Sequence, residues 1–165
     1  MRSEMPNLVQ LRELPRLLVY KIPPNWEDLN GHVNVQFYTT IYDLAGYPLM
    51  EMMGIDTEFS ANKRTGFFDL EHHIWFLNEM HVGDQISAYA CLIGRSVKRI
   101  HGVLFIVDDT RECLASALEF LCTAADLEKR RTAAVPKDVA QRVDTLIAEQ
   151  CARSWVVPQC GSMNL

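Results

Sequence analysis

The apolar residues of this chain change their spacing once, and that change restricts the folds that the chain can adopt. From Val35 to Met52 they recur at three- and four-residue intervals, which is the spacing of one face of a helix. From Phe68 to about Ala125 they fall on alternate positions in successive segments, which is the pattern of strands. The sequence therefore predicts one long helix followed by a run of strands.

The connections between these expected strands are short. Turn-forming residues separate them at Gly83-Asp84, at Gly94-Arg95-Ser96 and at Asp108-Asp109-Thr110. Parallel neighbours would need crossover connections of a dozen or more residues, so the sheet should be mainly antiparallel. One helix that covers one face of such a sheet gives an α+β fold.

The long helix carries signals for its start, its end and an interruption. Asn34 is a suitable N-cap because its side-chain oxygen can accept from an N–H of the first turn, and Gly54 is a suitable terminator. Pro48 removes one helical hydrogen bond, so we expect a kink or a division into two pieces near Tyr47. The polar stretch 56–66 is expected to be a loop.

The chain has 165 residues, which is the length of one ordinary domain. A short apolar run within 15–22, closed by two prolines, predicts a first strand before the long helix. We expect a single domain over 1–165, with a core of about 17–135, a C-terminal helix of about 136–150 that starts at Pro136, and a tail of 151–165 without periodicity.

Composition argues against several classes of protein. The net charge of -5 disfavours broad attraction to nucleic acid or anionic lipid. No apolar run approaches the ~20 residues of a membrane span, and the N-terminal residues lack a signal-peptide pattern. The five cysteines are odd in number and lack C-x-x-C spacing, which favours reduced thiols. We therefore expect a cytoplasmic protein that binds neither nucleic acid nor a membrane.

The segment 28–34 holds the main candidate for chemistry. Asp28, Asn30 and His32 occupy every second position directly before the long helix, so in an extended stretch they would project to one side. The helix N-terminus behind them would add free N–H donors and a partial positive charge. The alternative is an ordinary turn, because Asn30-Gly31 is a common turn pair.

Other polar residues lie on one expected strand and on the long helix. Glu71 lies among apolar neighbours in an expected strand, where it either faces an opening or sits on a solvated face. His72 and His73 are adjacent in the same strand and should point to opposite faces, so we expect no metal site. For Asp43, on the long helix, we expect a structural hydrogen bond.

The order of elements and the segment 28–34 together resemble the hotdog-fold acyl-CoA thioesterases of the 4-hydroxybenzoyl-CoA thioesterase type, over about Val19 to Arg142. The residues that carry this resemblance are Asp28-Leu29-Asn30-Gly31-His32-Val33-Asn34 with Tyr38, then Glu71, Ile74, Glu79, Gly83-Asp84, Lys98, His101, Asp126 and Arg130-Arg131. In that family an antiparallel sheet wraps around one long central helix, and two subunits pair so that substrate channels form between them. The resemblance implies a hotdog fold and a homodimer or dimer of dimers.

The resemblance also implies a reaction, the hydrolysis of an acyl-CoA thioester. Asp28 would be the catalytic carboxylate, as general base or as nucleophile, and Asn30 and His32 would support it. The helix N-terminus would polarise the thioester carbonyl. Substrate-binding positions are expected at Gly31, Val33, Asn34, Glu71, Arg95, Lys98 and Arg99, and Arg130 and Arg131 are further candidates for the phosphates of coenzyme A. No cofactor is expected, since coenzyme A enters as part of the substrate.

Two other functions fit the same fold. A non-catalytic hotdog module that binds acyl-CoA or an acyl carrier is the main alternative, although such a module has no need of Asp28. A dehydratase is a third option, which the lack of a helix-borne histidine after residue 34 weakens.

The segments Lys98-Arg99-Ile100-His101 and 71–79 are also similar to those of thioesterases that act on betainyl-CoA. Such a pocket must hold a quaternary ammonium, for which the aromatic faces of Trp26, Tyr42 or Trp75 would be suitable.

Overall fold

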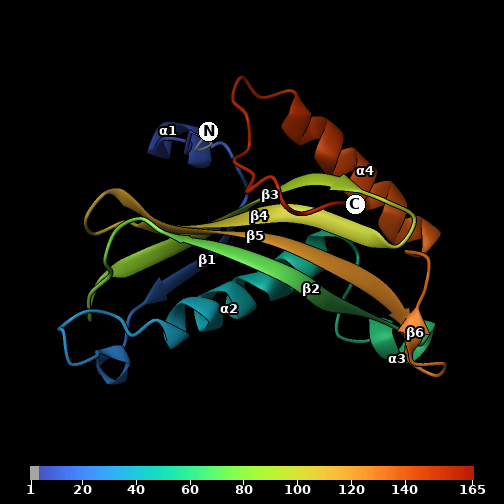
Figure 1. Ribbon diagram of the computed structural model, residues 1–165, viewed down its shortest axis with the longest axis horizontal. Coiled ribbons are helices and arrows are strands. Elements are labelled where there is room, and N and C mark those ends of the chain that lie inside the picture. Colours follow the sequence, from blue (N-terminus) through green and yellow to red (C-terminus); the bar gives the residue numbers. More distant parts are fainter. Residues whose placement is uncertain (1–3) are drawn as a thin grey trace.

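The computed structural model describes residues 4–165, and its centre is an antiparallel sheet with one long helix along one face (Figure 1). The strands are β1 (Arg16–Lys21), β2 (Thr65–Phe76), β3 (Gln85–Arg95), β4 (Arg99–Asp108), β5 (Cys113–Asp126) and β6 (Arg131–Thr132). The helices are α1 (Leu8–Leu11), α2 (Gln36–Met52), α3 (Phe59–Lys63) and α4 (Lys137–Cys151), with a 3-10 turn, η1, at Pro24–Trp26.

The strand order is β1-β3-β4-β5-β2, and every neighbouring pair is antiparallel. The short β6 pairs with the far end of β5. The predicted α+β class and the mainly antiparallel sheet are confirmed, and the curved sheet around a central helix with a C-terminal helix is the hotdog fold.

The two faces of the sheet are covered by different parts of the chain. On the inner face, α2 packs its buried stripe, including Ile41, Ala45 and Leu49, against alternate residues of the strands. On the outer face lie α1 and the C-terminal tail (Figure 1). They cover a second apolar cluster around Phe105, in which Trp155 packs edge-on against that ring. The strands therefore alternate between a helix-facing and a tail-facing side chain.

Helix α2 follows its predicted signals with one exception. The Asn34 side chain accepts a hydrogen bond from the N–H of Gln36 at 3.1 Å, and Gly54 ends the helix with a φ of 84°. The helix continues through Pro48, so the predicted division into two pieces is wrong. A proline costs one N–H bond, and the packing of Ala45 and Leu49 on either side of it holds the helix in one piece.

Other differences concern short elements. The expected loop 56–66 contains α3, which is anchored by the buried Phe59, and β2 begins earlier than expected, at Thr65. Two further elements, α1 and β6, span four and two residues and were not predicted. Elements of this length are too short to show a period.

Strand β2 forms one end of the sheet. It pairs with β5 along one side, and among residues 4–165 no strand pairs with its other side. Its exposed side chains include large apolar ones, Phe68, Leu70 and Phe76. An unpaired strand of this length with apolar side chains is a template for another strand.

The tail beyond α4 has no regular structure, as its lack of periodicity predicted, but it is held on the outer face. It covers a buried pair, His101 and Glu119, whose Nε2 and Oε1 lie 2.7 Å apart. The N–H of Cys160 donates to the other Glu119 oxygen at 2.6 Å, and Arg99 donates to the carbonyl of Asn164 at 2.9 Å. Across the described residues 4–165, no helix is both long enough and apolar enough to cross a membrane.

Candidate active site

The segment that carries Asp28 is a tight turn. The Asp28 carbonyl accepts from the N–H of Gly31 at 3.2 Å, and the Asp28 N–H donates to the carbonyl of His32 at 2.9 Å. Gly31 has a φ of 83°, a conformation that favours glycine. The extended stretch assumed from the alternation is therefore wrong, because the chain reverses between 28 and 32.

The turn nevertheless gathers the three predicted side chains. The backbone N–H of Asn30 donates to Asp28 Oδ1 at 2.7 Å, and its side-chain nitrogen lies 3.4 Å from Oδ2. His32 Nδ1 lies 3.7 Å from the same Oδ2. The hydrogen bond from the Asn30 N–H is the main cause that lowers the pKa of Asp28 below its ordinary value, so this carboxylate is ionised at neutral pH.

Two backbone hydrogen bonds fix the turn to its surroundings, and they leave one donor free. The Val33 N–H donates to the carbonyl of Met80 at 2.8 Å, and the Asn34 N–H donates to the carbonyl of Trp26 at 2.9 Å. The Gln36 N–H is taken by the Asn34 side chain. In the described part of the chain, the N–H of Val35 has no partner, so it is the helix N-terminal donor that can receive a ligand.

A groove of about 350 Å³ runs in front of this donor. Its lining comes from the turn, the first turn of α2 and the end of β2, and comprises Asp28, His32, Val33, Asn34, Val35, Tyr38, Phe76, Leu77, Asn78 and Glu79. Tyr38 and Phe76 meet edge to face with centroids 5.0 Å apart, and burial raises the pKa of Tyr38. The groove thus combines an ionised carboxylate, a free N–H and an apolar wall.

A buried ionic cluster supports the segment to which the turn is bonded. Asp84 accepts from the N–H of His81 at 3.0 Å and from Arg111 Nε at 2.7 Å, and Asp108 accepts from the Arg111 N–H at 2.9 Å. Met80 directly precedes His81 and receives the Val33 N–H. The predicted Gly83-Asp84 turn therefore holds the residues that precede β3, and one of these, Met80, binds the turn of the candidate site.

Several predicted substrate-binding residues lie elsewhere in the protomer. Arg95 lies at the end of β3, about 33 Å from the first residue of that strand. It forms a two-point ion pair with Asp144. Arg99 binds the tail, and Lys98 Nζ lies 3.4 Å from Thr132 Oγ1. Glu71 pairs with Leu121, on the face opposite α2, and is exposed. Within one copy, none of these residues reaches the groove.

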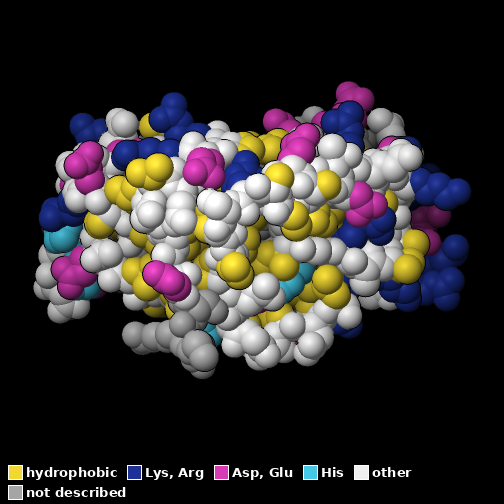
Figure 2. Space-filling model, turned by 90° about the horizontal axis from the view of Figure 1, so that it is seen from above, with side chains coloured by type: hydrophobic (Ala, Val, Ile, Leu, Met, Phe, Trp, Pro, Cys, Tyr) yellow, Lys and Arg dark blue, Asp and Glu magenta, His cyan; other side chains and the backbone are white. Residues whose placement is uncertain are grey.

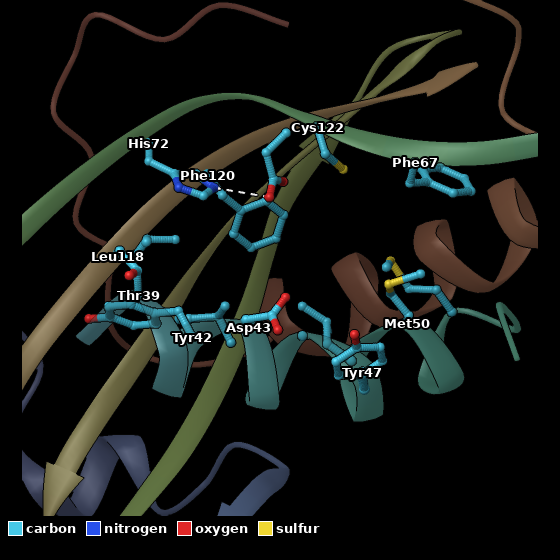
Figure 3. Close-up of a pocket in the computed structure, with 15 residues that line it drawn as sticks. Thr39, Tyr42, Asp43, Tyr47, Met50, Phe67, His72, Leu118, Phe120 and Cys122 are labelled. Atoms are coloured by element: carbon cyan, nitrogen blue, oxygen red, sulfur yellow. Dashed lines mark ion pairs between the residues drawn. The ribbon is translucent and has the colours of Figure 1, made fainter. Parts of the chain in front are cut away.

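A second pocket, a cavity of about 420 Å³, lies farther along α2 and β2 than the groove and shares no lining residue with it. Figure 3 shows the side chains that line this cavity. Asp43 lines this cavity and has no hydrogen bond within residues 4–165, so the expected structural bond is not found. His72 also lines it, 3.2 Å from Asp69, whereas His73 packs against Trp75, which confirms that the two histidines point to opposite faces. Sequence spacing did not predict that Asp43 and His72 line the same cavity.

The three aromatic candidates have separate locations. Tyr42 lines the cavity, and its hydroxyl donates to Ser116 Oγ at 2.8 Å. Trp26 is buried and stacked against Tyr20 and Phe37, and Trp75 belongs to the outer-face cluster. Only Tyr42 of the three is placed to face a substrate.

Fold and site together define the class, a hotdog-fold protein with a carboxylate at the N-terminus of its central helix. One solved structure with this architecture is the hypothetical protein SAV2348 from Staphylococcus aureus in complex with CoA, with a TM-score of 0.79 and 20% identity over 87% of this chain and 90% of that one. This likeness establishes the fold.

Sequence comparison then gives the family. The chain matches the Thioesterase-like superfamily over residues 22–143 and belongs to it. It is 30% identical over 147 residues to a betainyl-CoA thioesterase of Pseudomonas aeruginosa, covering 87% of this chain and 90% of the relative. It is 25% identical to the L-carnitine dehydrogenase/betainyl-CoA thioesterase of Ruegeria pomeroyi, covering 81% of this chain and 27% of that protein. The chain is therefore an enzyme of the thioesterase type.

Proposed function

We propose that this protein hydrolyses an acyl-CoA thioester at the groove, with Asp28 as its catalytic carboxylate. The observation that carries the proposal is the pairing of an ionised Asp28 with the free N–H of Val35 on one groove. A carboxylate can take part in hydrolysis only if the substrate carbonyl binds near it. Here both residues line one groove, which supports an attack on a carbonyl bound there.

The thioester carbonyl oxygen would accept a hydrogen bond from the Val35 N–H. In one route Asp28 takes a proton from water, and the resulting hydroxide attacks the carbonyl carbon. In the other route Asp28 itself attacks the carbonyl carbon, the C–S bond breaks as the anhydride forms, and water then hydrolyses the anhydride to the free acid and restores the Asp28 carboxylate. In both routes negative charge develops on the carbonyl oxygen, where the N–H and the helix dipole stabilise it, and the C–S bond then breaks to release the thiol of coenzyme A.

Asn30 and His32 would hold Asp28 in position. The Asn30 N–H keeps Asp28 ionised, and His32 lies close enough to bind water between its ring and the carboxylate. A substitution at Asn30 keeps its backbone N–H and removes only the side-chain nitrogen that lies 3.4 Å from Asp28 Oδ2, whereas a substitution at His32 removes the ring. Either change should lower kcat more than it raises KM, because neither side chain holds the acyl or the nucleotide part of the substrate.

We further propose that the site is completed by a second copy of the chain paired through β2. In an antiparallel β2 pair, the Thr65 end of one strand lies beside the Phe76 end of the other. Beside the Thr65 end lie Arg131, the first residue of β6, and Arg130, which precedes it. Lys and Arg side chains gather at this end of the molecule (Figure 2). Pairing would bring these charges toward the partner's groove, where the phosphates of coenzyme A can bind them.

The test is a thiol-release screen of acyl-CoA esters with short, long, aromatic and betainyl acyl groups. Betainyl-CoA is included because two relatives are named for it. Asp28→Asn should lower kcat/KM on the best ester by about 100-fold or more, the range of a lost general base. Glu27→Gln is the matched control, since it removes a neighbouring exposed carboxylate outside the groove.

Two results would contradict the proposal. One is an Asp28→Asn variant that hydrolyses its best ester as fast as the parent. The other is tight binding of acyl-CoA by the parent protein without thiol release from any ester, which is the behaviour of a binding module.

A further inference from the structure

Tyr38 lies near the start of α2 and is one of the residues that line the groove. The residue is only 6% exposed, and its ring meets that of Phe76 edge to face. Side chains of a helix lean back toward its N-terminus, so a ring that starts at Tyr38 covers the turn that begins at Val35. The Tyr38 ring therefore forms the groove wall on the side of the free Val35 N–H.

The hydroxyl of this ring has a proton that no described group accepts. Burial raises the pKa of Tyr38, the backbone N–H of Met80 at the hydroxyl oxygen acts in the opposite direction, and the negative charge of Glu79 adds to the rise. The hydroxyl therefore keeps its proton at neutral pH. Within residues 4–165 it donates to no acceptor, and it is not one of the enclosed polar atoms that lack a partner. Its proton is thus available to a molecule bound in the groove.

Met80 ties the position of this hydroxyl to the turn that carries Asp28. The carbonyl of Met80 accepts the Val33 N–H at 2.8 Å, and its own N–H faces the Tyr38 oxygen. Tyr42, one turn farther along α2, differs because its hydroxyl donates to Ser116 Oγ at 2.8 Å. Of these two tyrosines, only Tyr38 keeps its donor for a ligand.

From this geometry we infer that the Tyr38 hydroxyl donates a hydrogen bond to the thioester carbonyl oxygen, as a second donor beside the Val35 N–H. The inference rests on the proposed thioesterase function and adds a catalytic residue to it. A carbonyl oxygen has two lone pairs and can accept from both donors at once. Both hydrogen bonds strengthen as negative charge develops on that oxygen. Tyr38 keeps its proton throughout, and the bond-making steps stay with Asp28 and water.

The first test is the rate of hydrolysis by Tyr38→Phe, which removes one oxygen atom and keeps the ring that packs on Phe76. On the best ester of the parent, kcat should fall by about 100-fold, and by no less than about tenfold, as for the loss of one oxyanion donor. KM should change by less than about threefold, because the ground-state carbonyl carries less charge than the transition state.

The second test measures binding, and a purely structural role of Tyr38 would not produce its expected result. Two inert analogues of the best ester are compared by calorimetry. In the first, a methylene group replaces the thioester sulfur and the carbonyl stays; in the second, the carbonyl is also reduced to methylene. Tyr38→Phe should weaken binding of the ketone by about fivefold, the usual value of one hydrogen bond, and should leave binding of the carbonyl-free analogue unchanged.

The matched control is Tyr20→Phe. Tyr20 lies on β1, stacks on Trp26 and lines neither the groove nor the cavity. The same loss of a hydroxyl there should leave kcat and the affinity for both analogues as in the parent.

The outcomes separate this inference from the proposed function. If Tyr38→Phe keeps kcat within about tenfold of the parent, or if it changes the affinity for both analogues equally, the inference is wrong while hydrolysis through Asp28 stands. If the parent protein hydrolyses no ester, both are wrong.

Discussion

In the ionic cluster of Asp84, Asp108 and Arg111, we expect an Asp→Asn substitution to have opposite effects on the free energy of unfolding at the two aspartates. Asp84 and Asp108 are 6% and 0% exposed, and both carboxylates approach Arg111. Burial acts to raise the pKa of Asp84, but the hydrogen bonds from Arg111 and His81 outweigh it and hold the pKa below its ordinary value. Burial raises the pKa of Asp108, and the negative charge of Asp84 adds to that effect.

The difference follows from what each carboxylate binds. Asp84 accepts a charged hydrogen bond and a backbone one, so Asp84→Asn should lower the free energy of unfolding by about 2 kcal/mol. Asp108 accepts from the Arg111 N–H with Oδ1, whereas its Oδ2 lies 3.8 Å from Arg111 Nε and has no hydrogen bond among the described residues. An asparagine keeps that acceptor and removes a buried charge, so Asp108→Asn should raise the free energy of unfolding by about 1 kcal/mol.

The pH dependence gives a second check on the sign. Because the folded pKa of Asp108 is raised, folding binds a proton there, and the cost of its charge appears only as the pH rises above the ordinary value of 3.8. The gain from Asp108→Asn should therefore be full at neutral pH and fade toward about pH 4. The stability contributed by Asp84 is present above 3.8 and is lost as the pH falls through its lower folded pKa.

The assay is urea unfolding followed by tryptophan fluorescence, at neutral pH and near pH 4, on the parent and both variants. An Asp108→Asn variant that is destabilised as much as Asp84→Asn would refute this account of the cluster, because it would mean that Asp108 contributes its charge to the fold. A gain that persists unchanged near pH 4 would refute the assigned direction of the Asp108 pKa.

Two further predictions concern assembly and the pH profile of the reaction. Leu70→Glu on β2, the unpaired strand, should shift the protein to the monomer in sedimentation. Val19→Glu on β1 is the control and should not do so, although both parent side chains are 48% exposed. Equal effects of the two substitutions would show that β2 is not the interface. The hydrogen bond from the Asn30 N–H is the chief cause that lowers the pKa of Asp28, so this carboxylate stays ionised below pH 7. We therefore expect kcat/KM to stay level from pH 7 to about pH 5. A steep fall over that range would mean that another group is the base.

Much of the fold could be predicted because burial leaves a period in the sequence. Ile86, Ala88 and Ala90 alternate because β3 has one face toward α2, and the stripe of α2 repeats every three or four residues for the same reason. Pro48 was misjudged because propensity describes an isolated helix, whereas this helix is held along its length by the sheet.

The candidate site could be predicted only in part. Alternation placed Asp28, Asn30 and His32 together for the wrong reason, since spacing alone does not distinguish an extended stretch from a turn that folds back at Gly31. The cavity residue Asp43 could not be assigned because its opposite wall, including Phe120, depends on the strand register. Arg95 had suitable chemistry for a phosphate, but Asp144 of α4 already binds it.

The two ends of the sheet differ in a way that limits how many copies can join. β2 is an open strand of 12 residues, whereas β1 at the other end has 6, lies between Pro15 and Pro23, and ends in the charged Arg16 and Lys21. Prolines and charges are the usual protection of a sheet edge against further strands. The proposed twofold pairing through β2 would bury the one long unpaired edge found among residues 4–165 of each copy and would leave only the protected edges exposed. Edge-to-edge addition of strands would then end at the dimer. In a monomer the open β2 could pair with strands of other chains, and in the proposed dimer it is covered.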